Sequence, residues 1–219
     1  MENSKVLVYD GSFNGYLTAL SFAIKNNIDV IDFQNGNVPQ NGLFIETQIV
    51  VTQVLSAKEI WGEIEKKGST IIRNVYFAFL SENKGVELLL YTYIRNLFAH
   101  SLDLENRQSS TLEHRIGQLA KLVGSEKRQM EIFIDFKSNN DQIYITDIKP
   151  KYNILPLISR HFRFKHQNHQ WIIFDSKRNY GLYFNTKTIE IINLETKNWY
   201  LNSNAMLNSF NQDNYRYAV

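Results

Sequence analysis

Basic side chains gather in one short part of this 219-residue chain. Residues 147–181 hold seven lysines and arginines against two acidic residues, although the formal net charge of the whole chain is only +2. Such clustering suits a polyanionic partner, because lysine and arginine neutralise phosphates and release their counterions. The candidate nucleic-acid-binding residues are Lys149, Lys151, Arg160, Arg163, Lys165, Lys177 and Arg178.

Aromatic side chains lie among these cations. Tyr152, Phe164, Tyr180 and Tyr183 are available to stack on bases, as aromatic residues do in proteins that bind single strands. The alternative is a solvated basic surface with no nucleic-acid partner, since the chain is far less basic than dedicated DNA-binding domains. The sequence leaves both interpretations open.

Three residues are candidates for acid–base chemistry. Asp10 and Asp175 each end an expected strand, and either could act as a general acid or base or could orient His161. Each aspartate also has a structural interpretation, as a turn former or a strand terminator. These residues define an alternative function, an enzyme acting on nucleic acid or nucleotides.

No metal or cofactor is expected. The chain contains no cysteine, and the spacing of His161, His166 and His169 matches neither the H-E-x-x-H motif nor a compact zinc module. The turn at Asp10 and Gly11 precedes a helix, but the glycine spacing of a phosphate-binding loop is missing. A structural tight turn is the favoured interpretation there.

The periodicities predict an α+β protein with an antiparallel sheet and an inserted helical subdomain. We expect one domain over residues 1–197, with the helical subdomain at about 53–124. Residues 198–219 form an Asn-rich tail that we expect to be partly disordered.

Several elements should position the candidate residues in the N-terminal half. The run 6–9 predicts a strand, followed by a helix capped by Ser12 or Asn14. A short strand is expected within 44–51, and helices are expected over 57–67, 71–79 and 86–98. A further helix should begin at Thr111 and stop at Gly124.

The C-terminal half should contain most of the sheet. Residues 130–136 and 143–148 alternate with period two, which predicts an antiparallel hairpin. Pro156 lies near the start of an expected helix that ends near Lys165. A second strand pair is expected at 171–174 and 181–184, with one more strand at 188–192.

The N-terminus lacks the features of a signal peptide, and no apolar stretch approaches the roughly 20 residues that span a bilayer. We therefore expect a cytoplasmic protein with no membrane contact.

Several motifs resemble a bacterial family of unknown function that is associated with DNA metabolism and DNA repair. The matching stretches cover residues 6 to about 185 in order. They are Val8-Tyr9-Asp10-Gly11-Ser12-Phe13 with Gly15, Phe79-Leu80-Ser81-Glu82, Tyr93-Ile94-Arg95, Ile154-Leu155-Pro156-Leu157-Ile158, His161-Phe162, Gln170-Trp171-Ile172-Ile173-Phe174-Asp175, and Arg178 with Tyr180-Gly181-Leu182-Tyr183.

Members of that family look like companions of a radical S-adenosylmethionine protein, and some are fused to a uracil-DNA-glycosylase-like domain. The resemblance thus implies an accessory factor in DNA repair or modification, with these proteins as possible partners. By this resemblance the chain looks like a divergent or non-catalytic member, because it lacks the family's histidine between Glu126 and Met130 and has Lys149-Pro150-Lys151 where relatives tend to be acidic. A protein-binding scaffold without nucleic-acid contact is the remaining alternative.

Overall fold

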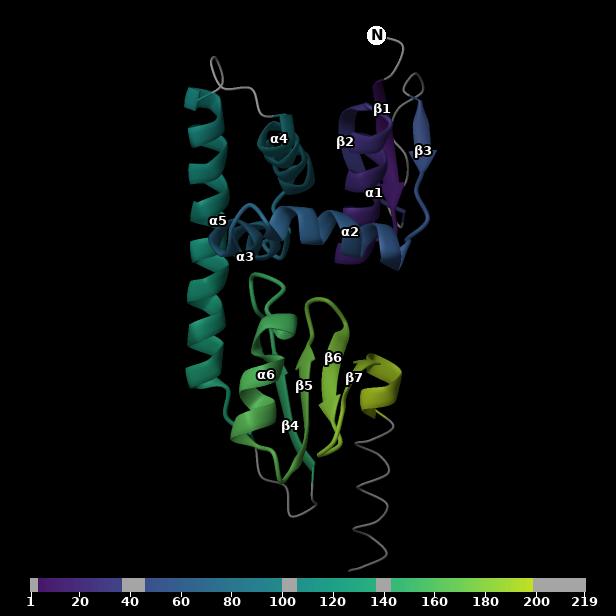
Figure 1. Ribbon diagram of the computed structural model, residues 1–219. Helices are drawn as coiled ribbons and strands as arrows, with labels where there is room; N and C mark the ends of the chain where they lie inside the picture. The colour runs from purple at the N-terminus through teal and green to yellow at the C-terminus, as the bar shows by residue number, and fades with distance from the viewer. Residues whose placement is uncertain (1–3, 37–45, 100–105, 137–142, 199–219) are drawn as a thin grey trace, which may run out of the picture. The chain divides into compact units, whose positions relative to one another are not determined.

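The structure is a computed structural model that describes residues 4–36, 46–99, 106–136 and 143–198 (Figure 1). The chain forms two compact units, Met1–Val123 and Gly124–Val219. Helix α5 (Asn106–Phe133) crosses the boundary and contributes residues to both. Whether residues 1–197 unfold as one domain stays a prediction, and the expected disordered tail beyond residue 198 lies outside the described residues.

The first unit contains a parallel three-stranded sheet. Strand β1 (Ser4–Tyr9) lies between β2 (Asp29–Asn35) and β3 (Thr47–Ile49). The last four residues of β1 are buried, as expected for a middle strand. Strand β1 and the segment of β3 confirm the sequence predictions, whereas β2 was not predicted.

Helix α1 (Phe13–Lys25) follows β1 and begins at a local cap. The Ser12 hydroxyl accepts a hydrogen bond from the Gly15 N–H at 2.9 Å, which satisfies one of the free donors of the first turn. The prediction of a strand, a tight turn and a helix capped at Ser12 or Asn14 is therefore confirmed, with Ser12 as the cap.

Three further helices pack on this sheet and on α1, namely α2 (Val54–Glu65), α3 (Ser69–Phe79) and α4 (Val86–Ala99). All three confirm the predicted helices to within a few residues at each end. Their buried residues, among them Ile64, Val75 and Leu90, belong to the same core as Leu7 of β1 and Ile116 of α5. The helices and the parallel sheet of this unit therefore share one hydrophobic core.

Helix α5 is longer at both ends than predicted, and it replaces part of a predicted strand. It neither begins at Thr111 nor stops at Gly124, and residues 130–133 are helical instead of forming a strand. Buried positions recur at helical spacing at Ile116, Ala120 and Val123, and a Lys127–Glu131 ion pair at 2.5 Å joins positions four residues apart. The period-two alternation of residues 130–136 was therefore misleading, because Ile132 is 73% exposed and Phe133 is 76% exposed.

The second unit contains a mixed four-stranded sheet in the order β4-β5-β6-β7, with helix α6 (Leu155–Lys165) on one face (Figure 1). Its strands are β4 (Ile143–Ile148), β5 (Gln170–Asp175), β6 (Tyr180–Phe184) and β7 (Ile189–Asn193). The β5–β6 pair is antiparallel as predicted, and β7 confirms the expected additional strand.

The predicted first hairpin is wrong, because β4 pairs with β5 in parallel. Helix α6 is the crossover between these two parallel strands, with Pro156 in its first turn as expected. The α+β class is thus correct, whereas an antiparallel sheet describes only β5, β6 and β7.

Within the described parts of the chain, no helix is both long and apolar enough to cross a membrane.

Candidate nucleic-acid interface

Helix α6 presents a basic and aromatic face to solvent. Its buried residues Leu155, Ile158 and Phe162 recur at helical spacing, so Arg160 and Phe164 project from the opposite side. The Phe164 side chain is 66% exposed, and the guanidinium carbon of Arg160 lies 5.7 Å from the centroid of its ring. A large aromatic ring is therefore held at the surface beside a cation. Arg160, Arg163, Phe164 and Lys165 are called the α6 ridge below.

A hollow of about 630 Å³ lies on the α5 side of the ridge. This α5-side hollow is lined by Lys127, Glu131, Leu157, Arg160, His161, Phe164 and Lys165. Three of these side chains are cationic and one is a carboxylate. The Glu131 carboxylate already accepts a hydrogen bond from Lys127, so the hollow keeps a surplus of positive charge.

His161 is the catalytic candidate that borders this hollow. Its Nδ1 atom lies 3.8 Å from Oε1 of Glu131, which is an ion-pair distance too long for a hydrogen bond. Its Nε2 atom is buried and has no hydrogen-bond partner among the described residues. The sequence reading missed Lys127 and Glu131 because it ended the helix at Gly124; their spacing of four residues was the available signal.

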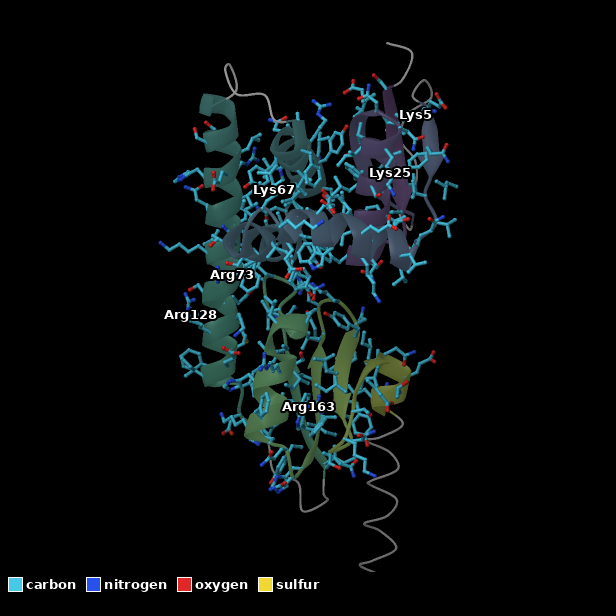
Figure 2. All side chains as sticks on the ribbon, viewed as in Figure 1. Lys5, Lys25, Lys67, Arg73, Arg128 and Arg163 are labelled. Atoms are coloured by element: carbon cyan, nitrogen blue, oxygen red, sulfur yellow. The ribbon has the colours of Figure 1, made fainter. Side chains whose placement is uncertain are left out.

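A second hollow, of about 610 Å³, lies on the other side of the ridge. This sheet-side hollow is lined by Ser159, Arg160, Arg163, Phe164, Gln167, Asn168, Phe184, Thr186 and Ile189. The Arg163 guanidinium donates a hydrogen bond to the carbonyl of Lys187 at 3.3 Å, which ties α6 to the loop between β6 and β7. Figure 2 labels Arg163 beside α6 in this unit. The sequence carried no motif that singled out Gln167, Asn168 or Thr186.

The structure divides the seven basic candidates between two places. Arg163 and Lys165 lie in the last turns of α6, whereas Lys149 and Lys151 lie beyond the end of β4, where the chain enters α6. Since α6 runs back across the sheet, these positions lie at opposite ends of the unit. The single surface expected from 149 to 178 is therefore divided into the ridge and a separate group, called the loop cluster below, which consists of Lys149, Lys151, Lys177 and Arg178.

The loop cluster is held by its own contacts. Lys177 Nζ donates to the carbonyl of Lys151 at 2.6 Å, and Nη2 of Arg178 donates to the same carbonyl at 3.0 Å. Glu126 accepts hydrogen bonds from the backbone N–H groups of Lys151 and Tyr152. Arg178 and Lys177 thus use their donors to organise the chain around residue 151.

Asp175 is fully buried and committed to structure. Its Oδ2 accepts from Nη1 of Arg178 at 2.7 Å, and its Oδ1 accepts from the backbone N–H groups of Lys177 and Arg178. The Arg178 side chain is itself only 9% exposed. Neither residue of this pair faces solvent as a catalytic acid or a phosphate-binding cation would.

Asp10 belongs to the first unit, at the end of β1. Its two oxygens accept hydrogen bonds from the Ser12 N–H at 2.9 Å and from the Thr52 hydroxyl at 2.7 Å. Partial burial acts to raise the pKa of Asp10, but the hydrogen bonds from Ser12 and Thr52 outweigh it and lower the pKa below its usual 3.8. Asp10 therefore stays ionised and acts as a local clamp between β1, α1 and the segment after β3.

Each catalytic candidate is held by its own set of neighbours. Asp10 is held by Ser12 and Thr52, Asp175 is held by Arg178, and His161 faces Glu131. His166 and His169 each pack against aromatic rings, with His166 centred 4.8 Å from Phe136. Nowhere in the described ranges do three His, Asp or Glu side chains gather as metal ligands would.

A protein-family model matches residues 84–217, more than half of the chain, and describes them as a domain of unknown function, DUF4130. The chain belongs to the DUF4130 family. No curated protein sequence matches it. The family description names no activity, so the link to DNA repair that the resemblance implies stays a prediction.

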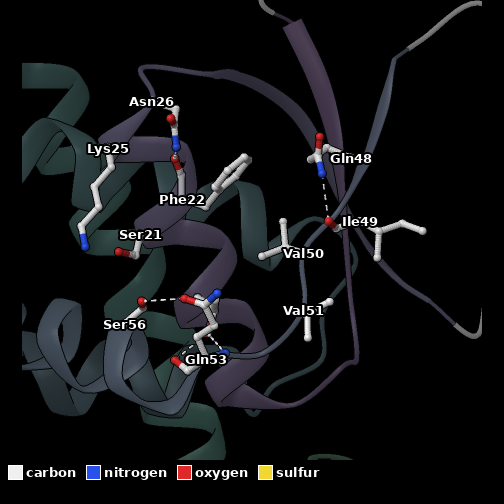
Figure 3. A pocket seen from close by; sticks show the side chains of 11 residues that line it. Ser21, Phe22, Lys25, Asn26, Gln48, Ile49, Val50, Val51, Gln53 and Ser56 are labelled. Atoms are coloured by element: carbon white, nitrogen blue, oxygen red, sulfur yellow. Dashed lines mark hydrogen bonds between the residues drawn. The ribbon is translucent and has the colours of Figure 1, made fainter.

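The DUF4130 match contains the whole ridge and both hollows beside it. It does not contain a third hollow, of about 450 Å³, between α1, β3 and the start of α2 (Figure 3). Polar side chains that line this third hollow already bond to the protein: Ser56 to the Gln53 amide, Asn26 to the Phe22 carbonyl and Gln48 to the Ile49 carbonyl. The open cationic surface of the DUF4130 segment is therefore the stronger candidate site.

Proposed function

We propose that this protein is a nucleic-acid-binding accessory factor in DNA repair or modification, and that the α6 ridge is its nucleic-acid interface. The observation that carries the proposal is Phe164, an exposed ring with Arg160 beside it and a basic hollow on its α5 side. Aromatic rings among cations are the usual platform for single-stranded nucleic acid.

The charges of the ridge are available to a ligand. None of Arg160, Arg163 and Lys165 forms an ion pair with a carboxylate of any described residue, and all three are exposed. Each phosphate neutralised on a single strand contributes roughly −0.7 to the slope of log affinity against log salt. Three contacts would give a slope of about −2.

The ring of Phe164 supplies the second part of the affinity. Stacking of one base on an aromatic side chain contributes roughly 1–3 kcal/mol in proteins of this kind. Because every base has a π face, such a contact is tolerant of sequence. The expected binding is therefore salt-dependent and only weakly sequence-specific.

The test is fluorescence anisotropy with a labelled single-stranded oligonucleotide at several salt concentrations. Arg160→Glu/Arg163→Glu should weaken binding at least tenfold at low salt and reduce the salt slope. Lys149→Glu/Lys177→Glu makes the same charge change in the loop cluster of the same unit and should change affinity less than threefold. Equal losses in the two double variants, or no salt-dependent binding by the unmodified protein, would refute the interface and leave the protein-binding scaffold.

A protein partner would need a different surface. The first unit exposes apolar side chains along β3 and the start of α2, with Ile49 at 66% and both Val51 and Leu55 at 77%. Exposed apolar side chains of this kind often mark protein interfaces. We propose that an enzyme partner, of the radical S-adenosylmethionine or uracil-DNA-glycosylase-like class that the resemblance implies, binds there. Val51→Glu/Leu55→Glu should abolish co-purification with that partner and spare oligonucleotide binding.

A second proposal is an enzyme that acts on nucleic acid or nucleotides, and the position of His161 favours it. The imidazole borders the α5-side hollow with the Glu131 carboxylate 3.8 Å from Nδ1, so substrate could reach a candidate base. Loss of turnover in His161→Ala, with folding retained, would support this proposal. Full turnover in that variant would exclude His161 as the catalytic base.

A further inference from the structure

We propose that the sheet-side hollow receives one unpaired base of a bound strand, while the α5-side hollow and the ridge hold the backbone phosphates. This inference rests on the proposed function and specifies the ligand as a single strand with bases, as opposed to a duplex or a bare phosphate backbone. The two hollows share Arg160 and Phe164, so a strand that crosses the ridge would reach both.

The two sides of the ridge differ in chemistry. The α5-side hollow adds Lys127, Lys165 and His161 to the shared residues, and is suited to anions. The sheet-side hollow instead adds the amides of Gln167 and Asn168 and the hydroxyl of Thr186. Amides and hydroxyls both donate and accept, which is what the Watson–Crick edge of an unpaired base requires.

The polar groups of the sheet-side hollow are open to a ligand. The Gln167 and Asn168 side chains are exposed, and neither forms a hydrogen bond with another described residue. Phe164 provides an exposed ring at one edge, and Ile189 provides apolar surface, whereas Phe184 is buried beneath the hollow. The volume of about 610 Å³ is within the range of roughly 300–1,000 Å³ that small-molecule sites occupy.

Backbone strain lies at the edge of this same hollow. Thr186 has a φ of 74°, in the left-handed region that a β-branched residue rarely adopts. The loop is held in this conformation because the Asn185 side chain accepts hydrogen bonds from the N–H groups of Lys187 and Thr188. Residues that surrounding contacts hold in a strained backbone conformation are often found at ligand sites. Thr186 therefore provides support for a binding role that is independent of charge.

A duplex would not satisfy this site. The base edges that Gln167 and Asn168 would contact are paired within a double helix, and the stacked base could not reach Phe164. A backbone without bases would still bind the cations of the ridge, but it would gain nothing from the sheet-side hollow. A single strand, a duplex and an abasic strand therefore test the phosphate-binding ridge and the base-binding sheet-side hollow separately.

The experiment measures anisotropy with three probes of equal length: a single-stranded DNA, the same DNA as a duplex, and a fully abasic phosphodeoxyribose strand. The unmodified protein should bind the single strand at least tenfold more tightly than the abasic strand. Gln167→Ala/Asn168→Ala should lose most of this preference while keeping its salt-dependent affinity for the abasic strand.

A matched control removes one glutamine and one asparagine elsewhere. Gln48→Ala/Asn26→Ala alters the hollow of the first unit and should keep the preference for bases unchanged. Equal affinity of the unmodified protein for the single strand and the abasic strand would overturn the base site, yet leave the ridge as a phosphate-binding surface. Binding to none of the three probes would overturn the proposed function as well.

Discussion

Nη1 of Arg178 lies 2.7 Å from Oδ2 of Asp175, and the two side chains are only 9% and 0% exposed. Because of this contact, Arg178 does not present its charge to nucleic acid as the sequence predicted. Asp175 likewise does not face solvent as a catalytic acid would. The contact also joins β5 to the loop after β4, because the same guanidinium donates to the carbonyls of Pro150 and Lys151. A buried ion pair that also bonds to the backbone of a neighbouring loop is a structural element of the second unit.

The buried pair leads to the first prediction. Arg178→Ala should lower the free energy of unfolding by about 3–5 kcal/mol, because it leaves the Asp175 carboxylate buried without its cation. Lys177→Ala removes an exposed neighbouring cation and should cost at most about 1 kcal/mol. Urea denaturation followed by circular dichroism measures both. A loss of similar size in the two variants would contradict the structural role assigned to the pair.

The second prediction concerns pH and Glu87, a half-buried residue of α4 that accepts a hydrogen bond from the Tyr9 hydroxyl at 3.3 Å. Burial raises the pKa of Glu87 above its usual 4.5; hydrogen bonds from its own backbone and from Tyr9 oppose the rise, and Asp32 and Glu82 add to it. The folded protein therefore holds this proton more tightly than the unfolded chain does.

Stability must then fall as the pH rises from about 4.5 through the raised pKa of Glu87. Glu87→Gln keeps an acceptor for Tyr9 but carries no charge, so this variant should be more stable than the unmodified protein at pH 7. Its advantage should shrink toward zero below pH ~4, where Glu87 is protonated in both states. Urea unfolding at several pH values tests this, and an advantage that does not change with pH would contradict it.

A matched pair of glycines provides the third prediction. A Cβ on Gly15 would lie 2.1 Å from Oδ1 of Asp10, which Ser12 and Thr52 hold in place, so Gly15→Ala should destabilise the protein by about 1–3 kcal/mol. A Cβ on Gly117 of α5 would meet no atom within 4 Å. Gly117→Ala should therefore stabilise the protein by about 0.5–1 kcal/mol. Thermal unfolding should therefore shift in opposite directions for the same substitution.

The fourth prediction depends on the proposed interface. Glu131 is the only carboxylate among the residues lining the two hollows beside the ridge. Glu131→Gln should strengthen oligonucleotide binding about two- to fivefold at low salt, because a unit charge about 4 Å away contributes about 1 kcal/mol in water. The gain should vanish at high salt through screening. Unchanged affinity at low salt would place the phosphates away from the α5-side hollow.

Local sequence was sufficient for a large part of the fold. Strand β1, the Ser12 cap, helices α2 to α4, and the β5–β6 pair were all predicted, because each of them lies within one short, continuous stretch of the chain. Strand β2 was not predicted, and for α5 only the part from Thr111 to Gly124 was. At the end of α5, a helical and a strand periodicity overlap over a few residues. The structure is helical over residues 130–133, where Ile132 and Phe133 are exposed and do not form the buried face of a strand.

The candidate site was predicted in part. Arg160, Arg163, Phe164 and Lys165 were identified from composition and helical spacing, and the structure places them together on α6. The remaining four cations lie elsewhere because α6 reverses the chain direction across the sheet. Whether a cation faces water or a buried carboxylate, as Arg178 does, depends on which strands become neighbours. Pairing of distant segments carries no local signal, so only the tertiary structure decided which charges stay free for a ligand.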